Sequence, residues 1–165
     1  MTAYVREFVD HHKEVQHFVA EAVAHISQRL NEQSGRRVRC YYSNDALREA
    51  LYLLIEPLTD RYEIDSGGIA DEFADQRIEQ IVDACRRDAQ RYPQEDPALE
   101  NLEEVFYASN GFWATVAYRL ANALWQLGVP IIPRSIAGAA HSRTGVDIHP
   151  GASIAPGLFI DHGTG

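Results

Sequence analysis

The chain has 165 residues, of which 45% are hydrophobic and 24% are charged, so it is long enough to bury an ordinary core. Its 24 acidic residues outnumber 15 Lys and Arg, for a formal net charge of −9. An acidic surface argues against non-specific nucleic-acid binding and against an anionic membrane as partner. Two cysteines are too few for a disulfide scaffold or a cysteine-only zinc site. The polar N-terminus and the shortness of the longest apolar run, residues 50–55, predict a cytoplasmic protein.

Apolar residues at three- and four-residue spacing predict an α-helical domain over residues 1–142. Caps, glycines and prolines bound the expected helices at 1–34, 43–58, 69–91, 96–110, 112–127 and 133–142. The Ser66-Gly67-Gly68 and Asn110-Gly111 sequences are expected to be breaks between helices. Tyr92-Pro93 should end the third helix, and Asp96-Pro97 should open the fourth with Asp96 as its N-cap.

The sequence period changes after residue 142. Ile148, Ile154 and Ile160 are six residues apart, and glycines at 151, 157 and 163 repeat with the same period. Neither an α-helix nor a simple hairpin has this repeat, whereas a parallel β-helix does. Each six residues would form one flat side of a coil, with the aliphatic residue pointing inward, and three sides would complete the coil. The expected fold class is therefore mainly α, with a helical bundle followed by a β-helix that begins at residue 143.

Residues 146–165 span little more than one such coil. A single coil has no neighbour on which to bury its face or pair its backbone, and solenoids need several repeats and a cap. We therefore expect the second domain, residues 143–165, to be the incomplete beginning of a β-helix. Either the chain is a fragment of a longer protein, or something else covers the exposed edge of the coil.

The residues of this region match a known motif. The run from Gly145 reads G-V-D-I-H-P-G-A-S-I-A-P-G and is followed by Phe159-Ile160-Asp161-His162-Gly163-Thr164-Gly165. It resembles the bacterial serine acetyltransferases, a family of hexapeptide-repeat acyltransferases with the pattern G-[IV]-D-I-H-P-x-A-x-I-G-x-G-x-x-[IL]-D-H-[AG]-T-G. Upstream, the D-P-A at Asp96 and the Y-R-L-A at Tyr118 also resemble that family. One departure is Ile154-Ala155-Pro156-Gly157 in place of I-G-x-G, where proline suits a corner.

The resemblance implies a left-handed β-helix and a reaction that moves an acetyl group from acetyl-CoA to the hydroxyl of L-serine, giving O-acetylserine for cysteine biosynthesis. Acetyl-CoA would be a co-substrate, with no permanently bound cofactor and no metal. Family members continue for several more coils, which carry a second histidine, an arginine and most of the acetyl-CoA site. The residues that bind acetyl-CoA are therefore expected beyond Gly165, and the isolated chain is expected to be inactive.

The resemblance also assigns roles to four residues. His162 would be the general base, because a serine hydroxyl is a weak nucleophile and imidazole ordinarily titrates near neutrality. Asp147, on a neighbouring coil fifteen residues earlier, would orient the imidazole. Asp161 and Asp96 would bind the amino group of L-serine, although helix capping alone would also select an Asp at 96. Arg119 is expected in an ion pair on the helix surface, which contributes little.

Two other functions stay open at this point. His141, His149 and His162 suggest a zinc enzyme like the γ-class carbonic anhydrases, which also use a left-handed β-helix, although their ligand pattern is missing. The chain could instead be a non-catalytic oligomerisation module, since the resemblance implies a trimer or a dimer of trimers built through both domains. The family's C-terminal tail, which would engage O-acetylserine sulfhydrylase, is not among these residues.

Overall fold

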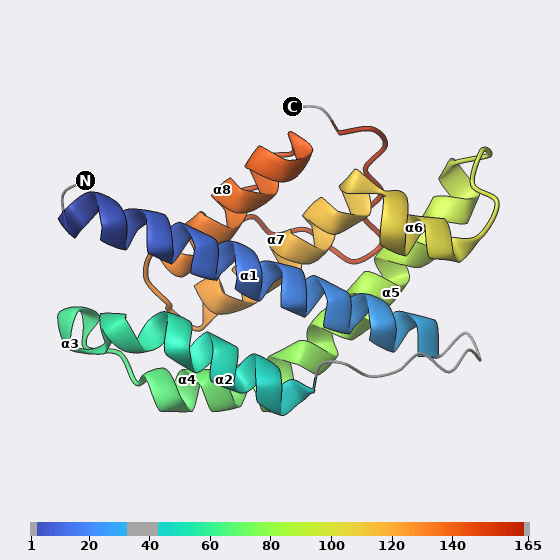
Figure 1. The fold of residues 1–165 in the computed structure, drawn as a ribbon. Coiled ribbons are helices and arrows are strands. Elements are labelled where there is room, and N and C mark those ends of the chain that lie inside the picture. Colours follow the sequence, from blue (N-terminus) through green and yellow to red (C-terminus); the bar gives the residue numbers. More distant parts are fainter. Residues whose placement is uncertain (1–2, 33–42, 164–165) are drawn as a thin grey trace.

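A computed structural model of the chain describes residues 3–32 and 43–163, and every regular element in these ranges is a helix (Figure 1). The elements in chain order are α1 (Ala3–Glu32), α2 (Asn44–Ile55), the 3₁₀ turn η1 (Glu56–Leu58), α3 (Thr59–Tyr62), α4 (Ser66–Glu72), the π-helical segment η2 (Phe73–Arg77), α5 (Ile78–Glu95), α6 (Leu102–Ala108), α7 (Asn110–Gln126) and α8 (Ile132–Thr144). The expectation of a mainly α fold is confirmed. The serine and glycine expected to stop the first helix, residues 34–35, lie outside the described residues.

Helix α7 is the centre of the bundle. Twelve of its 17 residues are buried, and it packs against α1, α5, α6 and α8. Small side chains such as those of Ala117 and Ala121, both fully buried, allow neighbouring helices to approach it closely. Larger apolar residues, among them Phe112, Leu120 and Leu124, fill the remaining core. Burial of apolar surface at this density is the main stabilising contribution to such a bundle.

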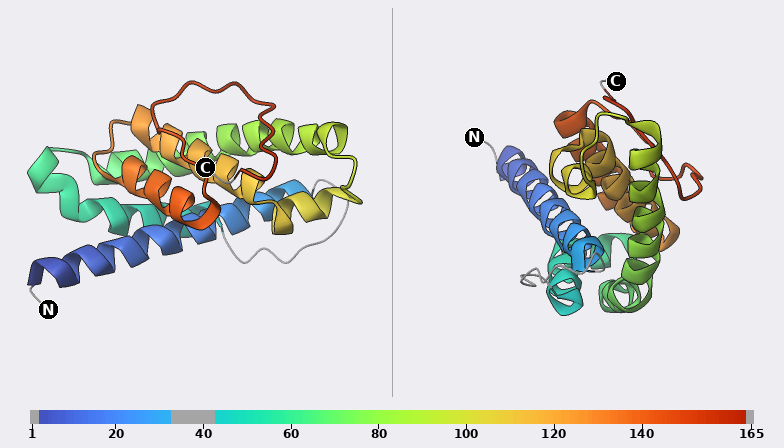
Figure 2. Two further views of the ribbon diagram at one scale, coloured as in Figure 1. Left: turned by 90° about the horizontal axis from the view of Figure 1, so that it is seen from above. Right: turned by 90° about the vertical axis from the view of Figure 1, so that its right-hand side faces the viewer.

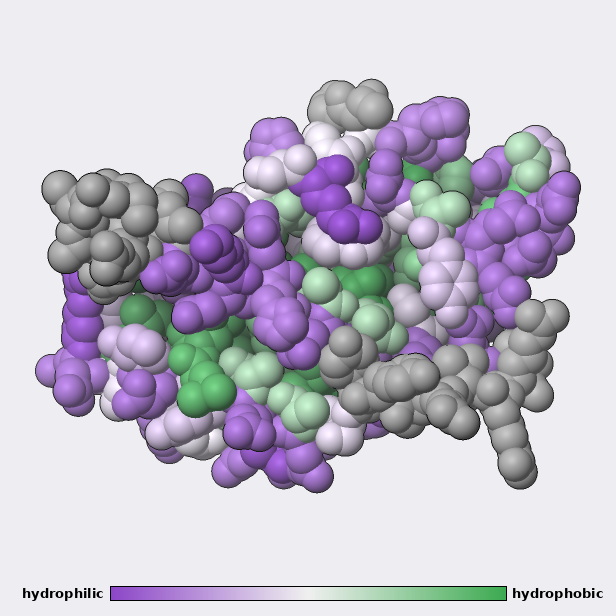
Figure 3. Space-filling model, in the orientation of Figure 1, coloured by the Kyte–Doolittle hydropathy of each residue, from purple (hydrophilic) through white to green (hydrophobic). Residues whose placement is uncertain are grey.

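Helix α1 crosses the front of the molecule, and α2, α3 and α4 lie below it (Figure 1). Val15, Val19 and Ile26 of α1 are fully buried, as the helical spacing of these residues predicts. Apolar surface remains visible between α1 and α2 (Figure 3), where Phe18, Leu53 and Leu54 are among the residues that line a groove. Leu53 is 62% exposed. Across the described residues, no helix is long and apolar enough to cross a membrane.

The two helix boundaries predicted from proline are wrong. Helix α5 continues through Pro93 to Glu95, because the buried Tyr92 packs against Phe112 and Phe159 and holds the last turn in place. Tertiary packing here outweighs the local preference of the residue before proline. Asp96 is not the N-cap of the next helix. Its Oδ1 instead accepts a hydrogen bond from the backbone N–H of Ala98 at 2.9 Å, within a turn.

Side-chain caps account for several of the remaining boundary differences. Asn101 caps α6, Ser109 caps α7 and Asp65 caps α4, each by accepting backbone N–H groups of the first turn. The predicted breaks at 66–68 and 110–111 therefore lie inside the first turns of α4 and α7. Helix α8 extends to Thr144, two residues beyond the prediction, and ends at Gly145 in the left-handed conformation with φ 79°.

The C-terminal segment, residues 145–163, curves over the side of α7 that faces away from α1 (Figure 2). It contains no strand within the described residues. After the bend at residue 145, its turns and bends fall at 150–151, 156 and 161–162, with stretches that have no regular structure between them. Ile148, Ile154 and Ile160 are each partly buried.

Side chains of α7 hold the backbone of this segment. Tyr118 Oη donates a hydrogen bond to the Ala152 carbonyl at 2.6 Å and accepts one from the Ile154 N–H at 3.2 Å. Asn122 Nδ2 donates to the Pro150 carbonyl at 2.7 Å. These bonds satisfy backbone groups that have no strand partner among the described residues.

Arg119 is not a surface residue, so that expectation is wrong. Its side chain is 9% exposed and pairs with Asp88 of α5, which is fully buried. The helical periodicity of α7 could not reveal this burial, because the cover over Arg119 is the C-terminal segment rather than another helix.

Candidate active site

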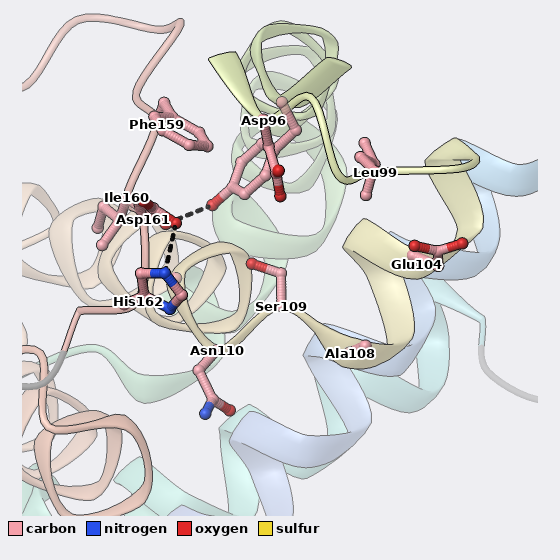
Figure 4. A pocket seen from close by; sticks show the side chains of 12 residues that line it. Asp96, Leu99, Glu104, Ala108, Ser109, Asn110, Phe159, Ile160, Asp161 and His162 are labelled. Atoms are coloured by element: carbon pink, nitrogen blue, oxygen red, sulfur yellow. Dashed lines mark hydrogen bonds and ion pairs between the residues drawn. The ribbon is translucent and has the colours of Figure 1, made fainter. Parts of the chain in front are cut away.

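A pocket of about 290 Å³ opens between the end of α5, helix α6, the start of α7 and the C-terminal segment (Figure 4). Each wall comes from a different part of the chain, so the pocket exists only in the folded molecule. Its lining residues are Tyr92, Asp96, Leu99, Glu104, Ala108, Ser109, Asn110, Gly111, Phe159, Ile160, Asp161 and His162.

Three of the four residues assigned from the sequence line this pocket. Asp96 follows α5, whereas Asp161 and His162 belong to the bend at 161–162 of the C-terminal segment. Chain folding thus brings an early carboxylate to the same cavity as the Asp-His pair. The fourth residue, Asp147, is exposed just beyond α8 and is not among the lining residues. In the described ranges, no hydrogen bond or ion pair joins Asp147 to His162.

His162 presents its imidazole openly at the pocket. The side chain is 90% exposed, and its Nε2 lies 3.6 Å from Asp161 Oδ1 (Figure 4). The residue has a positive φ of 46°, a conformation that is uncommon for residues other than glycine. Gly163 follows with φ 58°, so the backbone turns away directly after the histidine. An exposed imidazole beside a carboxylate has the composition of a proton-transfer site.

Tyr92 binds the backbone of Ile160, the residue that precedes Asp161 and His162. Tyr92 Oη donates a hydrogen bond to the Ile160 carbonyl at 3.5 Å, and its ring meets Phe159 edge-on with centroids 4.8 Å apart. Burial raises the pKa of the Tyr92 phenol, which keeps the hydroxyl protonated and able to donate. Helix α5 therefore supports the segment that carries Asp161 and His162.

Sequence reasoning gave no site role to four polar pocket residues: Tyr92, Glu104, Ser109 and Asn110. Two of them take part in capping a helix, Ser109 as the N-cap of α7 and Glu104 as a partner of the N-cap of α6. Ser109 Oγ accepts the Phe112 N–H at 3.0 Å, and Glu104 lies three residues after the cap Asn101, whose Nδ2 donates to its Oε1 at 2.9 Å. Asn101 followed by Glu104 resembles a capping box, so a search for caps could have located this helix start and its glutamate. Nothing local marks Tyr92, because its role depends on the distant Ile160.

The pocket has an acidic character. Asp96, Glu104 and Asp161 contribute carboxylates, and no Lys or Arg is among the lining residues that the structure describes. Negative charge on one side of a cavity attracts a cationic group and repels an anionic one. The lining is therefore matched to the ammonium group of a small molecule.

The three histidines considered for zinc lie in different surroundings. His149 Nδ1 accepts the Gly151 N–H at 3.0 Å and its ring packs against Trp125, whereas His141 is on α8 and His162 is in the pocket. Among residues 3–32 and 43–163, no three or more His, Cys, Asp and Glu are grouped as a metal site.

No family model matches the chain. Curated proteins do. A serine acetyltransferase of Synechococcus elongatus is 49% identical over 70 residues, which are 42% of this chain and 22% of that protein. The serine acetyltransferase of Helicobacter pylori is 47% identical over 76 residues, which are 46% of this chain and 44% of that protein. The chain is similar to serine acetyltransferases. It spans less than half the length of these two relatives.

Solved serine acetyltransferases also share the fold. Serine acetyltransferase 1 of Entamoeba histolytica, in complex with L-cysteine, aligns with a TM-score of 0.61 over 93% of this chain and 67% of that chain, at 20% identity. A serine acetyltransferase in complex with CoA aligns with a TM-score of 0.56 over 88% of this chain and 66% of that chain, at 25% identity. The first likeness concerns the fold alone. Together they relate this helical bundle to that of serine acetyltransferases.

Proposed function

We propose that this chain is part of a serine O-acetyltransferase, which transfers the acetyl group of acetyl-CoA to the hydroxyl of L-serine in cysteine biosynthesis. The observation that carries the proposal is the single pocket shared by Asp96, Asp161 and His162. Similarity to serine acetyltransferases at 47–49% identity supports it independently of the geometry.

The acidic lining accounts for recognition of the amino acid. The ammonium group of L-serine would lie against Asp96 and Asp161, since a charge-assisted hydrogen bond from an ammonium to a carboxylate is among the stronger polar contacts. Asp96 Oδ1 already accepts the Ala98 N–H, which holds the side chain in one position before substrate arrives. Asp161 lies beside the imidazole, so a bound ammonium group would place the serine hydroxyl near His162.

His162 would act as the general base. As the serine oxygen attacks the thioester carbonyl, the imidazole takes the hydroxyl proton and a tetrahedral adduct forms. When the adduct collapses, the carbon–sulfur bond breaks and the same proton can pass from the imidazolium to the departing thiolate of CoA. Asp147 would orient the imidazole, a role that requires His162 and Asp147 to approach each other when the site is complete.

Acetyl-CoA would be a co-substrate rather than a resident group. The described lining has no Lys or Arg for its phosphates, so residues other than those of this pocket would hold them. A serine acetyltransferase in complex with CoA is among the structures of similar fold, which supports this class of acyl donor.

The two-domain division follows the same proposal. Residues 1–142 would form the helical domain, and residues 143–165 would begin a left-handed parallel β-helix. The spacing of the bends at 150–151, 156 and 161–162 supports this, because a hexapeptide coil turns about every six residues.

A homo-oligomer, either a trimer or a dimer of trimers, is part of this proposal. The apolar groove between α1 and α2, with Leu53 at its surface, supports self-association. O-acetylserine sulfhydrylase is proposed as a partner of the complete protein.

The test is release of free thiol from acetyl-CoA in the presence of L-serine, measured on the protein as its gene encodes it. We expect turnover that depends on both substrates, and a His162→Ala variant that loses about a hundredfold or more in kcat, the usual scale for a general base. His141→Ala, an exposed histidine on α8, is the matched control and should keep wild-type turnover.

Absence of turnover in the encoded protein, with normal folding, would contradict the proposal and favour a non-catalytic scaffold. Wild-type kcat in His162→Ala would remove this histidine from the mechanism. The same assay on the 165-residue chain alone should detect no turnover, because no Lys or Arg for the phosphates of CoA is among the described lining residues of its pocket.

A further inference from the structure

A buried ion pair, Asp88 with Arg119, joins α5 and α7. Arg119 Nε donates to Asp88 Oδ2 at 3.1 Å and Nη2 donates to Asp88 Oδ1 at 3.0 Å, so the pair is bidentate. Asp88 is fully buried and Arg119 is 9% exposed. Removing two charges from water is costly, and such a pair is retained only where further hydrogen bonds use its remaining capacity.

Both members of the pair form their other hydrogen bonds with the C-terminal segment. Arg119 Nη1 donates to the Ile154 carbonyl at 2.6 Å, and Nη2 donates to the Ala155 carbonyl at 3.0 Å. Asp88 Oδ1 accepts the backbone N–H groups of Gly157 at 2.7 Å and Leu158 at 2.8 Å. Four backbone groups within residues 154–158 are thus bound by one ion pair.

This stretch leads directly into the pocket. Leu158 is followed by Phe159 and Ile160, which line the pocket floor, and then by Asp161 and His162. Gly157 has a φ of 96°, a conformation that favours glycine and that turns both N–H groups toward the same carboxylate oxygen. Leu158, the last residue that the ion pair binds, therefore lies only four positions before His162.

We propose that Asp88 and Arg119 are positioning residues: their ion pair fixes residues 154–158 on the helical domain and thereby holds Asp161 and His162 at the pocket. Because all four contacts are to backbone groups, the pair acts in place of a neighbouring strand. The catalytic consequence rests on the proposed function, but the anchoring itself does not.

Anchoring is tested by amide hydrogen exchange on the 165-residue chain. In Asp88→Asn, which keeps the side-chain shape but loses the charge, we expect exchange across residues 154–163 to accelerate at least tenfold while α1 and α7 keep their protection. Asp83→Asn is the matched control, because Asp83 lies on the same helix but pairs with Arg86 at the surface. It should leave the exchange of residues 154–163 unchanged.

A double variant, Asp88→Leu with Arg119→Met, keeps the test informative if Asp88→Asn does not fold. It replaces the pair with apolar side chains of similar length, which a core commonly tolerates, while removing all four backbone bonds. We expect it to unfold cooperatively like the wild type and still to show accelerated exchange at 154–163. Exchange as slow as the wild type in both variants would overturn the proposal. Uniform loss of protection throughout both variants would also overturn it, since the pair would then serve only the bundle.

Kinetics of the encoded protein test the consequence for the site. With the melting temperature unchanged, the double variant should lose at least tenfold in kcat. The single variant Arg119→Lys, which keeps the charge but not the planar fork, should show most of the same loss relative to the wild type. A wild-type kcat together with accelerated amide exchange at residues 154–163 would refute the positioning role of the ion pair. If the wild type has no turnover, the proposed function fails, and the exchange experiment still decides the anchoring.

Discussion

The backbone carbonyl of Ile160 occupies the space that any side chain at position 111 would need. A Cβ atom built on Gly111 would lie 2.1 Å from the Ile160 oxygen, far inside normal contact distance. Gly111 is in the first turn of α7 and Ile160 directly precedes Asp161, so the start of α7 meets the residue that leads into the Asp-His pair. Glycine is required here because of this close approach rather than because of its φ angle.

Gly111→Ala should therefore disturb the pocket. The backbone oxygen cannot rotate away as a flexible side chain could, so we expect a loss of about 1–3 kcal/mol in the free energy of unfolding, the usual cost of overpacking. Gly138→Ala is the control, since a Cβ at this exposed position of α8 meets nothing within 4 Å. Helix propensity predicts that the control gains up to about 1 kcal/mol. Urea unfolding followed by circular dichroism separates the two, and equal gains would contradict the contact with Ile160.

Tyr118 should contribute to stability through its hydroxyl. Tyr118→Phe leaves the Ile154 N–H without its partner, whereas the Ala152 carbonyl keeps a hydrogen bond from Asn122 Nδ2 at 3.2 Å. We expect a loss of about 1–3 kcal/mol in the free energy of unfolding, the cost of one unsatisfied group. Faster amide exchange at residue 154 should accompany it. Tyr62→Phe, in which the hydroxyl of a 38% exposed ring is removed, should change the unfolding free energy little. Indistinguishable unfolding curves for the two variants would argue against the docked arrangement of residues 152–154.

Cys85 should make the folded chain less stable in alkali. Burial raises the pKa of this thiol, with the Asp88 carboxylate as a second cause, so the folded state keeps a proton that the unfolded state loses above about pH 8.5. The unfolded state then binds fewer protons, and stability falls as pH rises, by up to about 1.4 kcal/mol per pH unit from this group. The contribution is fully present below the thiol pKa of the unfolded chain.

Urea unfolding between about pH 8 and pH 10 measures this loss. Cys85→Ala removes the titrating group, so its stability should start lower because of the cavity but decline about 2 kcal/mol less over that range. Parallel declines would mean that the thiol of Cys85 titrates normally in the folded chain.

Asp96 should affect substrate binding more than turnover. Asp96→Asn keeps the oxygen that accepts the Ala98 N–H but removes the negative charge, so the turn survives while attraction for an ammonium group weakens. In the encoded protein we expect the KM for L-serine to rise by about tenfold or more, in line with the loss of one charged hydrogen bond, with a smaller change in kcat. Asp60→Asn, at an exposed position of the helical domain, should leave both constants unchanged. A fall in kcat at constant KM would place Asp96 outside serine binding.

The sequence by itself determined the mainly α fold and the motif that contains Asp161 and His162. These features are local: helical spacing is read within a few turns, and a six-residue period needs only its own repeats. The resemblance to serine acetyltransferases assigned Asp96, Asp161 and His162 to one site, and the pocket brings them together. Their chemical roles, and that of Asp147, stay predictions.

Only the tertiary structure decided which residues support that pocket. Arg119 reads as a surface residue of α7 until the C-terminal segment covers it, and Asp88 becomes its partner from 31 residues away. Pro93 reads as a helix end until the packing of Tyr92 against Phe112 and Phe159 carries α5 past it. In each instance the deciding free energy comes from contacts between distant segments, which desolvate charges or bury rings, and no local pattern encodes such contacts.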